Sequence, residues 1–347
     1  MKVALDAMGG DVYPAPQVEG SIAALLEYPD LEVVLVGDTK VIEAELAKHP
    51  GYPKDRLTLF HASEVITMTD GAVEGVRKKK DSSLNRGVEM VKEGKAEAIV
   101  SAGNTGAIVA CSQLKLRTLP GIERPGIATV MPTTSGHFLL IDAGANPDPE
   151  PSHLVGYAIM GSIYSREVLG KSNPRVGLIS IGSEASKGNE FTRETFKLLQ
   201  EVSVINFAGN IEGHELFRDP TEVVVCDGFV GNVVLKTSES LAKAIFGWLK
   251  AELQSTLFRT LGAWLAKGAF LAIKKKTNTD EYGGMPLLGV NGIVIKAHGN
   301  SNAKAIKNAL RVARESVRQQ VNRRIIAEMS RHHESHQAAP SPAPSTT

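Results

Sequence analysis

The sequence has few cysteines and almost no net charge, and each shortage excludes a class of protein. Two cysteines, Cys111 and Cys226, are too few for a disulfide framework and suit a reducing compartment. The 39 basic and 38 acidic side chains leave a formal charge of +1, so no global field favours nucleic acid as a partner. Any site for an anion must therefore be local.

The sequence also lacks targeting and membrane-spanning segments. The N-terminal residues MKVALDAMGGD become polar and glycine-rich too early for a signal peptide. The best candidate span, residues 241–276, is interrupted by basic residues and falls short of the ~18 consecutive apolar residues that a span needs. We therefore expect a cytoplasmic protein, with attachment to the inner face of the membrane left open.

Three common catalytic motifs are missing as well. No G-x-G-x-x-G follows the first predicted strand, which weakens the case for a nicotinamide site. Residues 182–188 place Lys187 before Gly188, whereas a P-loop requires glycine and then lysine. No G-x-S-x-G supplies an acyl-accepting serine, and Cys111 and Cys226 have the apolar neighbours of buried thiols. We expect direct displacement without a covalent enzyme intermediate.

What the sequence does contain is an alternation of short β-branched runs and longer amphipathic stretches. The predicted strands are residues 2–6, 31–37, 56–62, 96–103, 126–132, 137–144, 175–182, 202–209, 222–228 and 292–299. Helical patterns lie between many of them, at residues 16–28, 83–94 and 153–170. Because several strands are apolar throughout, we expect a three-layer α/β fold with a doubly wound, mostly parallel sheet.

Three regions depart from this alternation. Residues 241–276 form a long, aromatic-rich helical stretch, and residues 300–329 predict a charged terminal helix. The tail after Arg331 is rich in proline and serine and predicts disorder. The expected organisation is one domain over residues 1–330, with a helical hairpin inserted at about 240–276 and a disordered tail over 331–347.

Polar, glycine-rich turns follow many of the predicted strands. They are residues 6–11, 101–106, 142–146, 181–188, 227–232 and 298–301. One such turn is usually mere strand-to-helix geometry, but ligands of open parallel sheets bind outside the carboxyl ends of the strands. Because each of these turns carries Asp, Asn, Lys or His, together they predict one composite site.

The turn formed by Gly103, Asn104, Thr105 and Gly106 is the strongest candidate for binding phosphate. Glycines let the backbone approach an anion, and free N–H groups at the start of a helix favour negative charge. The alternative is that Asn104 and Thr105 only cap the helix.

Several motifs stand in one order along the chain: LDAMGGD, SAGNTGA, DAGAN, IGSEASKGN, DGFVGNVVLKTSES and YGGMPLLGVNGIVIKAHGNS. Together they resemble the bacterial acyl-acyl-carrier-protein:phosphate acyltransferases, from Met1 to about residue 330. That family is distantly similar to phosphotransacetylases and to the isocitrate and isopropylmalate dehydrogenase fold.

The resemblance implies a homodimeric enzyme of phospholipid synthesis. It would transfer a fatty acyl group reversibly from acyl carrier protein to inorganic phosphate, with no cofactor and no metal. Its acyl phosphate product would pass to a membrane glycerol-3-phosphate acyltransferase. Two basic stretches are candidates for meeting the acidic carrier protein: residues 77–80 and the arginines at 311, 314, 318, 323 and 324. The alternative is that the run of lysines at 78–80 is a solvated face.

On this resemblance, Lys187 would supply cationic stabilisation and Asn232 a neutral amide donor beside it. The alternatives are a surface lysine and an asparagine that caps a helix beginning near Val233. Further candidates for binding substrate or phosphate are Asp227, Lys236 and His298, while Asp6 and Asp11 would only order their turn.

The stretch 241–276 carries an apolar stripe at helical spacing that includes Trp248, Leu261 and Trp264. Interleaved lysines and arginines suit a helix at a membrane surface, and Gly262 and Gly268 favour a hairpin over one rod. The alternative is that the stripe packs against the dimer partner or the sheet.

Two functions of other classes stay open at this point. One is a metal- and NAD(P)-dependent hydroxy-acid dehydrogenase of the related fold, although paired aspartates at helical spacing are not evident. The other is a non-catalytic nucleotide sensor or membrane scaffold.

Overall fold

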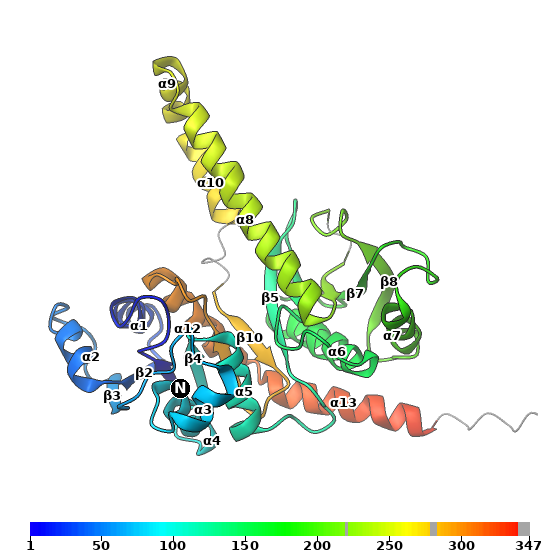
Figure 1. The fold of residues 1–347 in the computed structure, drawn as a ribbon, viewed down its shortest axis with the longest axis horizontal. Helices are drawn as coiled ribbons and strands as arrows, with labels where there is room; N and C mark the ends of the chain where they lie inside the picture. Colours follow the sequence, from blue (N-terminus) through cyan, green and yellow to red (C-terminus); the bar gives the residue numbers. More distant parts are fainter. Residues whose placement is uncertain (219–220, 278–282, 339–347) are drawn as a thin grey trace, which may run out of the picture.

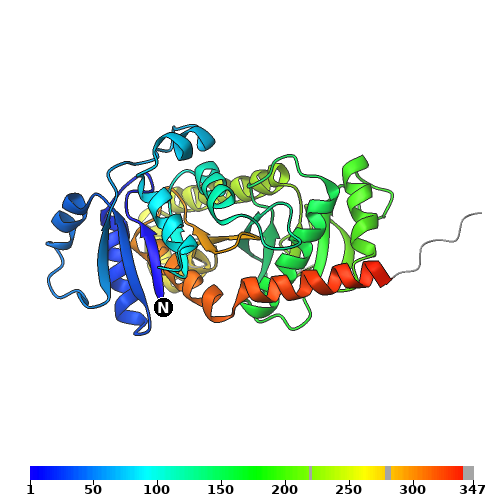
Figure 2. The ribbon, with the colours of Figure 1, turned by 90° about the horizontal axis from the view of Figure 1, so that it is seen from below.

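The computed structural model describes residues 1–218, 221–277 and 283–338. One eleven-stranded sheet runs through them in the order β3-β2-β1-β4-β11-β10-β5-β6-β9-β7-β8. In Figure 2 the blue-to-cyan half and the green half of the molecule lie on either side of the orange strands.

The first half of the sheet is parallel. Its strands are β1 (Lys2–Asp6), β2 (Glu32–Gly37), β3 (Leu57–His61), β4 (Ala98–Ser101) and β11 (Ile293–Lys296). Hydrogen-bonded registers join β3 to β2, β2 to β1, β1 to β4 and β4 to β11 in parallel. The carboxyl ends of these strands therefore share one edge.

Apart from its first strand, the second half is also parallel but runs the other way. Its strands are β5 (Gly126–Pro132), β6 (His137–Ile141), β7 (Arg175–Ser180), β8 (Asn206–Glu212) and β9 (Val223–Val225). Antiparallel pairs join β10 (Met285–Leu288) to β11 and to β5, and β5 to β6. The mostly parallel sheet is confirmed, while β10 was not expected from the sequence.

Helices cover both faces of the sheet, because successive strand side chains point to opposite sides. Ala4, Leu140 and Val224 belong to the core on the face of α4 (Ser83–Lys92) and α5 (Thr105–Leu116). Leu5, Leu139 and Val225 belong to cores on the other face. That face carries α1 (Ala15–Glu27), α6 (Pro151–Glu167) and α12 (Ala303–Arg318), which completes the three layers.

Smaller helices complete the two halves: α2 (Thr39–Leu46), α3 (Ala72–Lys78) and α7 (Glu190–Gln200). The expected terminal helix is two helices, α12 and α13 (Val321–Ala338). Gln320 lies between them and has a left-handed backbone (φ 51°). The sequence gives no sign of this break, because the position is not a glycine. The α13 helix continues past Arg331, where disorder was expected, and residues 339–347 lie outside the described part of the chain.

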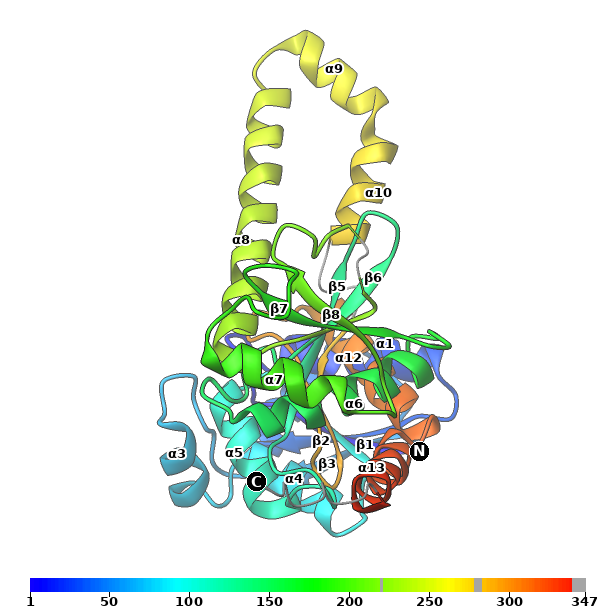
Figure 3. The same cartoon turned by 90° about the vertical axis from the view of Figure 1, so that its right-hand side faces the viewer.

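A helical arm projects from the body of the molecule (Figure 1). It consists of the far part of α8 (Gly228–Leu253), then α9 (Leu257–Leu265) and α10 (Lys267–Thr277). Figure 3 shows α8 rising on one side, α9 crossing the tip and α10 descending on the other side. The hairpin outline is as expected, but it contains three helices, and α8 begins inside the body rather than near residue 240.

In the described part of the chain, no helix combines the length and apolar character needed to cross a membrane.

Candidate functional site

The turns at residues 6–11, 101–106 and 298–301 meet where β1, β4 and β11 end. The Ser101 hydroxyl donates to Asp6 Oδ2 at 2.7 Å and accepts from Gly103 N at 3.1 Å. Asp11 N donates to Gly299 O at 2.7 Å. Asp6 is buried, and burial raises the pKa of its carboxyl against the lowering effect of the Ser83 and Ser101 hydroxyls. Asp6 thus orders the turn.

The turn at Gly103–Gly106 leads into α5. Asn104 caps the helix, because its Oδ1 accepts from Ala107 N at 3.1 Å while its amide nitrogen donates to Met68 O. The hydrogen-bonding groups of the Asn104 side chain are therefore occupied. Asn104 caps the helix, as the alternative interpretation of this turn predicted. The backbone N–H groups of Thr105 and Gly106 donate to no acceptor among the described residues. Because they lie at the helix N-terminus, these two groups can bind an anion.

The turns at residues 142–146 and 227–232 form a second unit in the other half of the molecule. The buried carboxylate of Asp142 accepts from the backbone N–H groups of Gly144, Ala145 and Asn146 at 2.7–3.1 Å. Burial raises the pKa of Asp142, and these amides oppose that shift. A Cβ atom at Gly231 would overlap the carbonyl oxygen of Asp142, so α8 packs against this turn only with glycine there.

Asp227 is the N-cap of α8, since its Oδ1 accepts from Val230 N at 2.8 Å. Asn232 is consequently inside the first turns of the helix and is not the cap. Its side chain lies against Gly144, where a Cβ atom would stand 3.6 Å from Asn232 Oδ1. The amide of Asn232 is therefore held beside the Asp142 turn.

The α8 helix connects the two units. Asn232, Lys236 and Glu239 follow at i, i+4 and i+7, and residues at this spacing share one face of a helix. Glu239 Oε1 lies 3.3 Å from Nε2 of His298, which follows β11. One stripe of α8 thus reaches from the Asp142 turn to the end of β11.

The charged groups at this junction are strongly perturbed. Burial lowers the pKa of Lys296, the last residue of β11, to about 8, with Glu239 opposing the shift. Burial also lowers the pKa of His298 to about 4, and Lys296 and Lys243 add to it. The pKa of Glu239 is raised by burial. At neutral pH the contact therefore joins a neutral imidazole to the Glu239 carboxyl group rather than two opposite charges.

Lys187 lies apart from this junction. Its loop follows β7, which neighbours β9 in the sheet, so it starts from the same edge as α8. The loop folds on itself: Lys187 is exposed and lies against Gly182, and Glu184 O accepts from Asn210. Within the described residues, the Lys187 ammonium group has no hydrogen bond or ion pair. Lys187 and Asn232 are thus not joined by any contact.

One face of α8 thus runs from the turns at 142–146 and 227–232 to the turn at 298–301, while no hydrogen bond or ion pair among the described residues joins the turn at 181–188 to that face. Sequence reasoning missed Glu239 and Lys296. A lysine in the apolar run IVIKA was a signal for a functional charge, and Glu239 could have been found at i+7 from Asn232.

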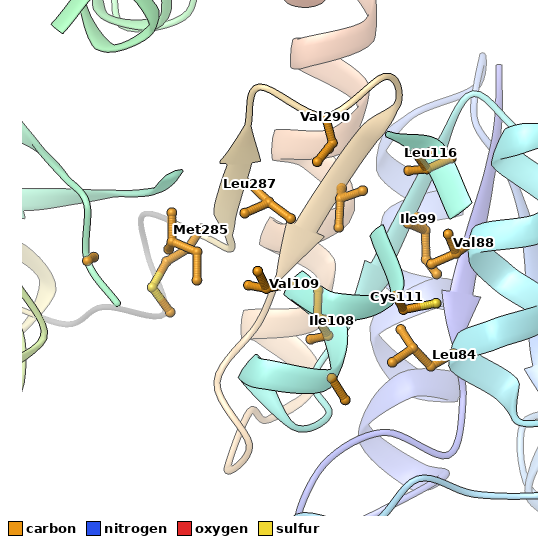
Figure 4. Packing of buried hydrophobic residues seen from close by; sticks show 14 of the residues in the cluster. Leu84, Val88, Ile99, Ile108, Val109, Cys111, Leu116, Met285, Leu287 and Val290 are labelled. Atoms are coloured by element: carbon orange, nitrogen blue, oxygen red, sulfur yellow. The ribbon is translucent and has the colours of Figure 1, made fainter. Parts of the chain in front are cut away.

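Both cysteines are buried. Figure 4 shows Cys111 packed beside Leu84 and Val88. Burial raises the thiol pKa of Cys111 to about 12 and that of Cys226 well above its ordinary value. Thiolates are the nucleophilic form, so these thiols are poor nucleophiles.

Two groups of side chains in the described chain could hold a metal ion, Glu19–Glu45–His49 and Glu123–Glu150–His153. Neither contains a residue of the α8 junction. In the second group His153 Nδ1 already accepts from Glu150 N, and Nε2 lies 3.0 Å from Glu123. Both ring nitrogens of His153 are thus in use without a metal.

The residues expected to touch a membrane all lie on the arm. Trp248, Leu261 and Trp264 are 68%, 59% and 69% exposed. The apolar stripe is therefore not packed against the sheet, which removes one of the alternatives.

Comparison with known proteins gives consistent matches over nearly the whole chain. The model of the family described as "Fatty acid synthesis protein" matches residues 1–324. Proteins named phosphate acyltransferase are similar throughout. The one from Geobacter sulfurreducens is 49% identical over 329 residues, covering 95% of this chain and 94% of that protein. The one from Halothermothrix orenii is 48% identical, covering 92% and 96%.

Solved structures confirm the fold class. A phosphotransacetylase from Streptococcus pyogenes superposes with a TM-score of 0.59 at 19% identity, covering 92% of this chain and 94% of that one. The EutD phosphotransacetylase from Staphylococcus aureus gives a TM-score of 0.55 at 15% identity, covering 95% and 94%. At these identities the likeness concerns the fold alone.

Proposed function

The chain belongs to the fatty acid synthesis protein family and is a phosphate acyltransferase by similarity, and we propose that its donor is a fatty acyl-acyl carrier protein. The acceptor is inorganic phosphate and the product is an acyl phosphate. This assignment favours acyl transfer over the dehydrogenase and scaffold alternatives.

The observation that carries the proposal is the α8 junction. A neutral amide (Asn232), a cation (Lys236) and an acid (Glu239) share one helix face that meets Lys296 and His298. Lys296 is in register with Ser101, the first residue of the turn at 101–106. Cations beside free backbone amides suit an oxyanion acceptor and the charge that develops during acyl transfer.

In the proposed reaction the N–H groups of Thr105 and Gly106 bind phosphate, with Lys236 and Lys296 as cations. A phosphate oxygen attacks the thioester carbonyl, and a C–O bond forms. The amide of Asn232 stabilises the negative charge on the carbonyl oxygen. The C–S bond then breaks, and the thiolate leaves with the bonding pair. Lys296, with its pKa near 8, is suited to give that thiolate a proton.

Further candidate residues support these catalytic groups. Asp227 fixes the start of α8, and His298 lies beside Glu239. Lys187 stays a proposed source of cationic stabilisation. It is exposed and unpaired within the described chain, so it is available to a bound substrate rather than to the protein.

The arm supports two further proposals. We propose that the protein is a homodimer in which part of the apolar stripe is covered by the partner subunit. The tip, with Trp264 and Leu261, rests on the cytoplasmic face of the membrane, because tryptophan and basic residues suit that interface. The apolar acyl phosphate would then be released close to a membrane glycerol-3-phosphate acyltransferase.

The direct test incubates the protein with acyl-acyl carrier protein and phosphate and traps acyl phosphate with hydroxylamine. We expect hydroxamate only when phosphate is present, with acyl-coenzyme A as a poor donor. Chelator treatment should leave the rate unchanged. Equal turnover of acyl-coenzyme A would contradict the donor assignment, and absence of product would contradict the function.

Lys187 and Asn232 can be tested separately in the same assay. Lys187→Ala and Asn232→Ala should fold normally and each lose about 100-fold in turnover, as expected for loss of a charge-stabilising group. A variant that keeps more than half of the wild-type rate would remove that residue from the mechanism.

A further inference from the structure

A cavity of about 390 Å³ lies on the face of the sheet opposite α5, between α6, α12 and the strands β5 and β10. This volume is within the range of small-molecule sites, about 300–1,000 Å³. His298 lines the cavity, and the same ring contacts Glu239 of α8. The cavity therefore ends at the α8 junction.

The cavity follows α12 away from that junction. The helix begins at Ala303, shortly after His298, and Arg311 and Arg314 also line the cavity. At 1.5 Å per residue, these arginines lie roughly 12 to 17 Å further along the helix axis. The lining therefore includes a histidine just before the start of α12 and two arginines further along that helix.

The wall between these residues is of mixed chemistry. Val130, Val168 and Val312 supply apolar surface. Thr129, His137 and Tyr164 bring a hydroxyl group, an imidazole and a phenol into the same wall. A long acyl chain favours an uninterrupted apolar lining, because each polar group that it covers loses water without gaining a hydrogen bond. An arm that alternates methylene and amide groups fits this wall better.

The far end carries two arginines among several carboxylates. Arg311 and Arg314 face one lining carboxylate, Glu315. Arg314 is fixed in place by Asp30, at 2.9 Å, and by the ring of Tyr28, 4.9 Å from its guanidinium carbon. Arg318 follows Arg311 and Arg314 at helical spacing near the end of the same helix. A phosphodiester attached to an acidic protein suits this end.

We propose that this cavity receives the pantetheine arm of the acyl donor, with the phosphodiester at Arg311 and Arg314 and the arm passing His298 so that the thioester lies beyond it, towards Asn232 on α8. The inference rests on the proposed function, since it assumes a carrier-protein donor. It adds the route of the arm and separates it from the acyl chain, which must leave the thioester in another direction.

The test uses a variant that narrows the cavity and measures how tightly it binds carrier protein with and without the pantetheine arm. Val168→Trp places a large side chain in the wall. Val155→Trp is the matched control, because Val155 is on the same helix and lines a different cavity of about 210 Å³. Holo-carrier protein carries the arm without an acyl chain, and apo-carrier protein lacks the arm.

We expect wild type and Val155→Trp to bind holo-carrier protein at least tenfold more tightly than apo-carrier protein. In Val168→Trp this ratio should fall to about one, with binding of apo-carrier protein and the thermal unfolding midpoint unchanged. An unchanged ratio in Val168→Trp, or an equal loss in Val155→Trp, would overturn the proposal.

A second measurement distinguishes the arm from the acyl chain. For Val168→Trp, kcat/KM should fall about equally with hexanoyl- and palmitoyl-carrier protein. A loss that grows with acyl length would assign the cavity to the acyl chain instead. Absence of turnover by wild type with every thioester would contradict the proposed function. The ratio of holo- to apo-carrier protein binding would then decide whether the cavity receives the arm.

Discussion

The body of the molecule (residues 1–218, 221–240 and 283–338) and the arm (residues 241–277) use the same apolar residue types in opposite ways. In the body, Phe138 and Leu139 are completely buried, whereas Leu257 and Phe258 of the arm are 90% and 89% exposed. Burying such a side chain contributes about 1.5–3 kcal/mol. Packing within the subunit therefore specifies the body, and contacts outside it must account for the apolar residues of the arm.

The strongest test of this difference is a pair of matched truncations. Leu139→Ala should lower the free energy of unfolding by about 3–5 kcal/mol, because it leaves a cavity in a closed core. Leu257→Ala should change it by less than about 0.5 kcal/mol, as for an exposed site. Urea denaturation at low protein concentration measures both. A large loss for Leu257→Ala would mean that a partner covers the arm even in dilute solution.

The next test compares two lysines of the same helix, one in the body and one in the arm. Lys236→Ala should lower kcat/KM about 100-fold, because Lys236 is on the stripe that meets His298. Lys250→Ala, three to four turns further along α8, should stay within about twofold. Steady-state assays in detergent-free solution measure kcat/KM for both variants. Equal losses would extend the functional part of α8 into the arm.

A smaller effect is expected in membrane binding. Wild type should co-sediment with anionic vesicles at low salt, and Leu261→Glu should weaken the binding about tenfold, the loss expected for one apolar contact. Leu26→Glu is the body control, since Leu26 is 68% exposed against 59% for Leu261. If wild type stays in the supernatant, the arm meets only protein.

The smallest effect is a pH dependence that arises from burial in the body. Lys296 has its pKa lowered from 10.5 to about 8, so its charged form predominates below that value and is lost above it. The kcat/KM for phosphate should fall as pH rises through about 8, by up to tenfold per unit. Lys296→Arg should move the decline to higher pH, because arginine keeps its charge. An identical profile in that variant would exclude Lys296 as the titrating group.

Local patterns predicted most of the body. Parallel strands are recognisable because runs such as EVVLVG are apolar on both faces. The strand β10 was missed because MPLL is short, contains Pro286 and is flanked by glycines, all of which resemble a turn. The start of α8 was missed for a similar reason. Gly228 and Gly231 suggest a loop, yet they are helical because only glycine lets α8 approach the Asp142 turn.

The turns of the candidate site were predicted from the sequence, but the contact that links them through α8 was not. Each turn was visible at the end of a strand, whereas the bridge made by Glu239 and His298 joins residues 59 positions apart. No local pattern encodes such a pairing. The surroundings of Lys187 were not predicted for the same reason, because the sequence of its loop does not show which residues the lysine will face.

The continuity of α8 links the arm to the site in one further respect. The helix has no break from Gly228 to Leu253, a span of roughly 38 Å, and it carries Asn232 near one end and Trp248 near the other. A straight helix transmits tilt and rotation from end to end. Any partner that tilts the distal end therefore displaces the amide of Asn232. If binding of such a partner changes the affinity for substrate by some factor, then binding of substrate must change the affinity of the distal end for that partner by the same factor.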